Sequence, residues 1–113
     1  MSELSITEIE TSLKLLPQQI HDAGQVLVEA ENKLAQAEAQ LDIEKAKIRI
    51  QYADTELSAK VIESYAIVGT TEQINEVIMA TKEVELKKLA KTLLEDKYIS
   101  ARKIANLRNI YQA

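Results

Sequence analysis

The run IHDAGQVLVEAENKLAQAEAQLDIEKAKI, residues 20–48, decides the fold of this chain, because its apolar residues repeat with the period of packed helices. Large aliphatic side chains recur every seven positions, at Ile20, Leu27, Leu34, Leu41 and Ile48. Alanine stands three residues after each of the first three, at Ala23, Ala30 and Ala37. This alternation of large and small residues predicts a long helix that packs closely against a partner helix.

The residues before this run set the expected start of the helix. Thr7 and Glu10 have the spacing of a capping box, which predicts a short helix over 7–16. Pro17 suits the first turn of a helix but not its interior. We therefore expect a second, long helix over 17–67.

A break inside this long helix, at 54–55, is the alternative. Asp54 or Thr55 could cap a separate short helix that would run from 55 to 67. The continuous helix is the preferred prediction.

The expected reversal of the chain lies in VGTTEQ, residues 68–73. Gly69 is expected to end the helix in the left-handed conformation, and Thr70 with Gln73 forms a second capping box. A last helix is then predicted over 71–111. Its expected apolar stripe consists of Met79, Leu86, Ala90, Leu93, Ile104, Leu107 and Tyr111.

Composition supports this architecture. The 113 residues include two glycines, one proline and four tyrosines as the only aromatics, which favours long helices and a thin core. We predict one all-α domain over 1–113, a long antiparallel, coiled-coil-like helical hairpin preceded by a short N-terminal helix.

A further apolar stripe, from Ile43 to Val61, would stay in water in a single hairpin, so self-association is expected to complete the fold. The predicted self-association residues are Ile20, Leu27, Leu34, Leu41, Ile43, Ile50 and Leu57.

Charge is unevenly distributed in a chain of net charge −4. With a reversal at Gly69, the numbers of facing residues add up to about 139. This register pairs three bases of the C-terminal part with acids of the first half, as Lys97 with Asp42, Arg102 with Glu38 and Arg108 with Glu31.

The same register brings two acid-free segments, KAKIRIQYA (45–53) and LKKLAKTLL (86–94), to one level. We call their basic side chains the basic belt. Such a belt could bind the phosphates of nucleic acid, with Tyr52 stacked on a base. Its alternatives are a solvated face or pairing with acids of another subunit. The predicted nucleic-acid-binding residues are Lys45, Lys47, Arg49, Tyr52, Lys87, Lys88 and Lys91.

Known catalytic and metal-binding patterns are missing from the sequence. It has no cysteine, and its one histidine, His21, follows Gln18 where a di-iron bundle would need glutamate. We expect no enzyme activity, no cofactor and no metal. Because no apolar run approaches the roughly 20 residues of a membrane span, we expect a cytoplasmic protein that does not contact membranes.

Much of the chain resembles a family of small all-helical phage proteins encoded among recombination and replication genes. The likeness lies in TELSAKVIESY, GTTEQINEVIMATKEVELKKLAKTLLEDK and YISARKIANL, and in the earlier KLAQAEAQLDIEKAKIRI. The resemblance implies an accessory role beside a single-strand-binding protein or a recombinase in the infected cell, and no catalytic residues.

Two functions follow from these observations. The first is a non-enzymatic, oligomeric accessory protein of phage DNA recombination or replication that binds single-stranded nucleic acid or its protein partners through the basic belt. The second is a protein-binding adaptor, or an inhibitor of a host protein, with no nucleic-acid contact.

Overall fold

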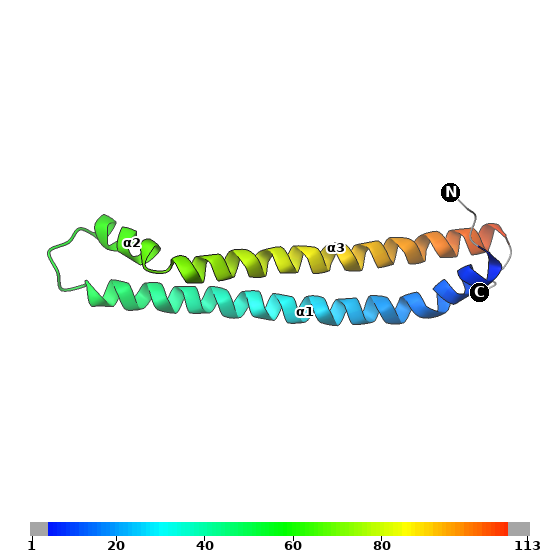
Figure 1. The fold of residues 1–113 in the computed structure, drawn as a ribbon, viewed down its shortest axis with the longest axis horizontal. Helices are drawn as coiled ribbons and strands as arrows, with labels where there is room; N and C mark the ends of the chain where they lie inside the picture. The colour runs from blue at the N-terminus through cyan, green and yellow to red at the C-terminus, as the bar shows by residue number, and fades with distance from the viewer. Residues whose placement is uncertain (1–4, 109–113) are drawn as a thin grey trace. The chain divides into compact units, whose positions relative to one another are not determined.

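The computed structural model describes residues 5–108, and this part of the chain consists of three helices and their connections (Figure 1). They are α1 (Ile6–Gln51), α2 (Ala59–Val68) and α3 (Thr71–Leu107). The chain divides into two compact units. The terminal unit contains the described residues 5–28 and 86–108, and the tip unit contains residues 29–85. Within each unit α1 lies antiparallel to the returning chain, which confirms the predicted all-α helical hairpin. The prediction of a single domain stays a prediction.

The side of α1 that faces the returning chain carries the predicted heptad repeat. Its buried or half-buried residues are Ile9, Leu13, Leu16, Ile20, Ala23 and Leu27 in the terminal unit, and Ala30, Leu34, Ala37, Leu41 and Ile48 in the tip unit. Their alternating spacing of three and four residues keeps one stripe against one neighbour. Four predicted self-association residues, Ile20, Leu27, Leu34 and Leu41, therefore lie in the seam of the hairpin itself.

The inner face of α3 differs from the predicted stripe. Its buried or half-buried residues include Val77, Ala80 and Val84 in the tip unit, and Lys87, Lys91, Leu94, Tyr98, Ala101 and Ala105 in the terminal unit. The predicted stripe residues Met79, Leu86, Ala90, Leu93 and Leu107 are exposed, Ile104 is half-buried, and Tyr111 lies outside the described residues. Helix α3 thus has apolar residues on two faces, and the one richer in leucine is turned outward.

The start of α1 also differs from its prediction. The Ser5 hydroxyl accepts a hydrogen bond from the amide of Glu8 at 3.1 Å, so Ser5 caps the helix in place of Thr7. Helix α1 continues through Pro17, and the predicted separate helix over 7–16 is its first part. Proline lacks the N–H that would bond the carbonyl four residues earlier, which explains the bend at the blue end of α1 in Figure 1.

The chain reverses at residues 52–58, so the predicted continuous helix over 17–67 is wrong and the break at 54–55 is present. The Thr55 hydroxyl donates to the carbonyl of Tyr52 at 2.6 Å and so closes the turn after α1. The cap of α2 is Ser58, whose hydroxyl accepts from the amide of Val61 at 3.3 Å. Neither Asp54 nor Thr55 occupies that cap position.

Gly69 joins α2 to α3 without reversing the chain. Its φ of −72° is right-handed, which corrects the left-handed prediction. The neighbouring Thr70 is buried, and its hydroxyl donates to the carbonyl of Ala66 at 2.6 Å, back into α2 and not forward as a cap of α3. Helices α2 and α3 therefore follow one another along α1.

The early reversal changes the register of the hairpin. In the tip unit the rings of Tyr52 and Tyr65 lie 5.2 Å apart, and their numbers add up to 117. In the terminal unit Gly24 lies beside Lys91, and these two residue numbers add up to 115. Within each unit the predicted register of about 139 is therefore wrong, and the three ion pairs and the basic belt derived from it stay predictions.

The two glycines predict opposite responses to alanine. A Cβ at Gly69 would lie 2.7 Å from Cδ1 of Ile48 and 3.0 Å from the carbonyl oxygen of Tyr65. We expect Gly69→Ala to lower the free energy of unfolding by about 1–3 kcal/mol, because this overpacking pushes on backbone as well as on a side chain. A Cβ at Gly24 would meet only Cε of Lys91, at 3.8 Å. Gly24→Ala should therefore raise the free energy of unfolding by about 0.5–1 kcal/mol. Urea unfolding followed by circular dichroism measures both, and equal effects of the two changes would contradict the close packing at Gly69.

Candidate functional site

The basic segment 45–53 lies near the end of α1, in the tip unit, and acids lie beside its bases. The Lys47 ammonium bonds the Glu44 carboxylate at 3.0 Å on the same helix. The Arg49 guanidinium donates two hydrogen bonds to Glu63 of α2, at 3.0 and 2.9 Å. Lys45 lies close enough to Glu63 to lower its pKa. Acids next to these bases therefore offset much of the positive charge that the sequence suggested.

The pair of Arg49 and Glu63 shifts the pKa of both partners. The hydrogen bonds from Arg49, followed by its charge, lower the pKa of the Glu63 carboxyl. The same bonds raise the pKa of Arg49, with a smaller contribution from the charge of Asp42. A planar guanidinium that binds a carboxylate with two parallel bonds fixes direction as well as distance. This pair therefore sets how α2 is turned on α1.

The other half of the predicted belt belongs to the terminal unit. Lys87 and Lys91 are half-buried on the face of α3 that lies against α1, and Lys88 is exposed. Within this unit Lys91 lies beside Gly24, a position without a side chain that leaves room for the lysine stem. These lysines thus serve partly as packing residues, and the contacts of each unit do not assemble the belt.

Tyr52 lies in a hollow of about 320 Å³ in the tip unit, lined by Ile48, Gln51, Tyr52, Tyr65, Val68 and Gly69. Its ring is tilted by 49° against that of Tyr65, so the two tyrosines cover one another in part. Base stacking by Tyr52 stays a prediction.

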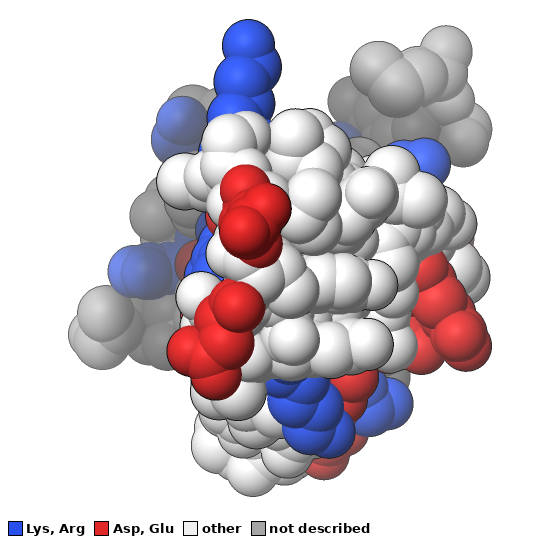
Figure 2. Space-filling view, turned by 90° about the vertical axis from the view of Figure 1, so that its left-hand side faces the viewer, with Lys and Arg blue, Asp and Glu red and all other residues white. Residues whose placement is uncertain are grey.

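Several apolar side chains of the tip unit are exposed, and two of them, Tyr65 and Val68, line this hollow. We call them the tip patch: Ile50, Leu57, Val61, Tyr65, Ile67 and Val68. Figure 2 views the molecule from this end, where uncharged surface fills the centre and acids and bases lie mostly toward its edges. Helix α2 is apolar on most of its circumference, and a helix of that kind is normally covered on more than one side. The tip patch is therefore a candidate surface for a protein partner, and sequence analysis found only its members Ile50, Leu57 and Val61.

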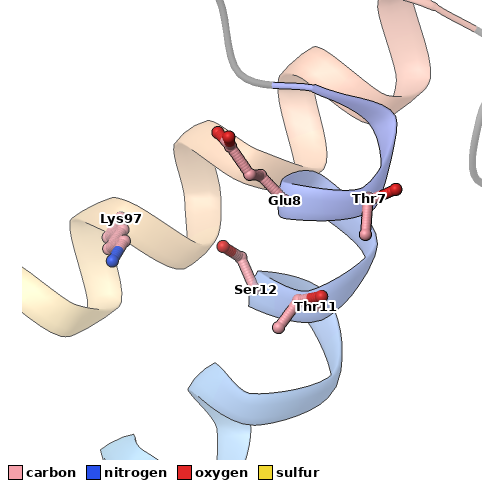
Figure 3. Close-up of a pocket in the computed structure, with 5 residues that line it drawn as sticks. All are labelled: Thr7, Glu8, Thr11, Ser12 and Lys97. Carbon is pink, nitrogen blue, oxygen red and sulfur yellow. The ribbon is translucent and has the colours of Figure 1, made fainter.

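A second hollow lies in the terminal unit between the first turns of α1 and the middle of the returning α3. It has a volume of about 340 Å³, and Thr7, Glu8, Thr11, Ser12 and Lys97 line it. Figure 3 shows four of these side chains on α1, with Lys97 across from them on α3. Lys97 thus lies beside hydroxyls and Glu8 of its own unit. This open, polar hollow resembles ordinary helix surface and supplies no catalytic set.

Residues 5–108 contain no group of three or more His, Asp or Glu side chains gathered as metal ligands. None of the three helices is long and apolar enough to cross a bilayer. No protein-family model, curated protein or solved structure matches the chain.

The Arg49–Glu63 pair predicts a pH dependence of stability. Because the pKa of Glu63 is lower in the folded state than its ordinary 4.5, ionised Glu63 stabilises the fold above that value. The contribution disappears as the pH falls through the lower, folded-state pKa. We expect Glu63→Gln to be less stable than the natural chain at pH 7, and the difference to shrink as the pH falls below 4.5. Urea unfolding at several pH values from 7 downward measures this difference in stability. Glu76→Gln, at an exposed position, is the control. A difference that persists unchanged at low pH would contradict the role of this pair.

Proposed function

We propose that this chain is a non-enzymatic protein-binding module, an adaptor or an inhibitor that acts through apolar surface on the outside of its helices. Of the two functions that the sequence suggested, this is the one that the geometry favours. The observation that carries it is the amount of apolar surface that the described structure leaves in water.

The described core is small, and the exposed apolar set is large. Seven apolar residues are buried among residues 5–108, and four of these are alanines. Eighteen large apolar side chains in the same range are exposed. Single exposed aliphatic residues are normal on a protein surface, but contiguous ones mark interaction sites. Within the tip patch, Tyr65 and Val68 lie together, because both line the same hollow.

Nucleic-acid binding has lost its main structural support. The hypothesis depended on six positive charges at one level of the hairpin, and the register that placed them there is wrong. Lys47 and Arg49 bond acids within their own unit. A net charge of −4 also disfavours non-specific attraction to phosphates. Binding of single strands is therefore the competing outcome of the test below.

The resemblance to phage proteins supports a cellular setting for this proposal. In that setting the partner is a protein of DNA recombination or replication in the cytoplasm of the infected cell. A partner bound through apolar contacts gives an affinity that changes little with salt, whereas contacts to phosphates lose affinity steeply. Salt dependence therefore separates the two functions.

The experiment combines an oligonucleotide titration with a protein-partner assay. We expect no binding of a labelled single-stranded oligonucleotide at about 50 mM salt, where phosphate contacts would be strongest. We expect purified recombination or replication proteins of the same phage to include one that binds the chain with similar affinity at about 50 and 200 mM salt. Val68→Lys should weaken that binding by about tenfold or more, because Val68 lines the hollow and its apolar side chain is 73% exposed.

The matched control is Asn75→Lys, which adds the same charge at an exposed position of α3 in the same unit, outside the tip patch. It should leave partner binding nearly unchanged, and both variants should keep the helical circular dichroism of the natural chain. Salt-sensitive binding of the oligonucleotide would overturn the proposed function, and so would equal effects of the two lysine variants.

A further inference from the structure

The outer face of α3 in the terminal unit carries three leucines. Leu86, Leu89 and Leu93 are exposed, and their spacing of three and four residues places them in one stripe. The residues of α3 that face α1, such as Lys87, Lys91 and Leu94, lie on the other side of the helix. The stripe continues toward the C-terminus as Asp96, Ser100 and Lys103, all exposed and all polar.

The outer face of α1 in the tip unit has the complementary sequence. Opposite its buried seam it carries Ala39, Ile43 and Ala46, all exposed, in the same spacing of three and four. The stripe continues in the N-terminal direction as Gln36, Asn32 and Glu29, which are also exposed. One stripe thus has large apolar residues and then a base, and the other has small apolar residues and then an acid.

A stripe with alternating spacing of three and four residues is covered by another helix with the same spacing, because only such a helix follows it along its length. We propose that the outer stripe of α1 in one copy packs antiparallel on the outer stripe of α3 in a second copy of this chain. Leu86, Leu89 and Leu93 then lie opposite Ala46, Ile43 and Ala39. In the same register Lys103 lies opposite Glu29.

Registers shifted by one heptad fit less well. The good fit of a single register is the reason to propose a second copy of this chain as the partner of these stripes. A shift of seven residues in one direction places Asp96 on Ile43 and Leu86 on Ala53, which lies beyond the end of α1. A shift in the other direction places Asp96 on Glu29 and puts Leu89 and Leu93 on polar residues. Of these three registers, only the proposed one places all three leucines on apolar residues of α1 and also pairs a base with an acid.

Charged residues beside the stripes agree with this register. The hollow of about 220 Å³ on α3, lined by Ile99, Arg102, Lys103 and Asn106, lies where Glu29 and Glu31 of the second copy would approach. Lys88 lies near the level of Asp42. Two pairs of like charges also come near one another in this register, Lys33 with Lys97 and Glu38 with Glu95. Opposite charges still outnumber like charges along the contact. The self-association residue Ile43 belongs to this interface.

This inference rests on the proposed function, because it assigns one outer surface to a second copy and leaves the tip patch to another partner. The chain has no cysteine, so single cysteines can report the register directly. A disulfide needs Cβ atoms about 3.5–4.5 Å apart, which restricts it to facing positions. We mix the full-length variants Ile43→Cys and Leu89→Cys under mild oxidation and measure the yield of the mixed disulfide.

The matched control replaces Ile43→Cys by Ile50→Cys, one heptad away on the same face. Ile50 is 75% exposed and Ile43 is 49% exposed, so random collision would favour the control. We expect the mixed product of residues 43 and 89 to form several-fold more than the product of residues 50 and 89, and more than either self-product. Equal yields, or a larger yield for the control, would overturn the register.

Mass in solution supplies the second measurement. We expect sedimentation to give at least twice the chain mass of 12.7 kDa at tens of micromolar, and Leu89→Glu to reduce it to one chain mass. The control Leu15→Glu has a similar exposure, 53% against 55% for Leu89, and in this register faces no residue of the second copy. A monomeric natural chain would overturn the inference but not the proposed function, which the partner assay decides.

Discussion

The structure depends on one continuous seam along α1, in which residues three and four apart alternate between alanine and a larger aliphatic residue. Small residues such as Ala30 and Ala37 let the helices approach, and Leu34 and Leu41 fill the space between successive alanines. This seam can bury only one face of each helix. A chain that has apolar residues on two faces, as α3 does with Val84 inside and Leu86 outside, therefore leaves one of them to a partner. The small core and the large exposed apolar surface have the same origin.

The second constraint is the place at which the chain reverses. Because the reversal lies at residues 52–58, α2 lies on the end of α1, and Arg49 meets Glu63. Arg49 of the basic segment thereby helps to orient α2 on α1. Gly69 and the buried Thr70 let the chain pass from α2 to α3 while it stays close to α1. Interaction surfaces at the tip and on the outer faces follow from this arrangement, since the seam buries only part of the apolar residues and the others remain exposed.

The heptad repeat at Ile20, Leu27, Leu34 and Leu41 was enough to predict the helices and their packing, because periodicity determines which face is buried. The reversal could not be predicted in the same way. Gly69 and Asp54 both offered local signals, and which of them turns the chain depends on tertiary contacts such as Tyr52 with Tyr65. A misplaced turn shifted the register by more than twenty residues, and the predicted belt lost the alignment from which it was derived. Of the candidate site, the exposed Ile43, Ile50 and Leu57 were predicted, whereas Tyr65, Ile67 and Val68 were missed because α2 was assigned to a longer helix.

The position of the reversal also has a consequence for the order in which the chain folds. Arg49 and Glu63 are separated by 14 residues along the chain, whereas Gly24 and Lys91 are separated by 67. Closing the longer loop from the open chain costs about 1 kcal/mol more in chain entropy than closing the shorter one. Contacts around Tyr52 and Tyr65 therefore form early, and each later layer then closes only a few additional residues. We therefore expect the tip unit, whose contacts lie closest to the turn along the chain, to fold before the terminal unit.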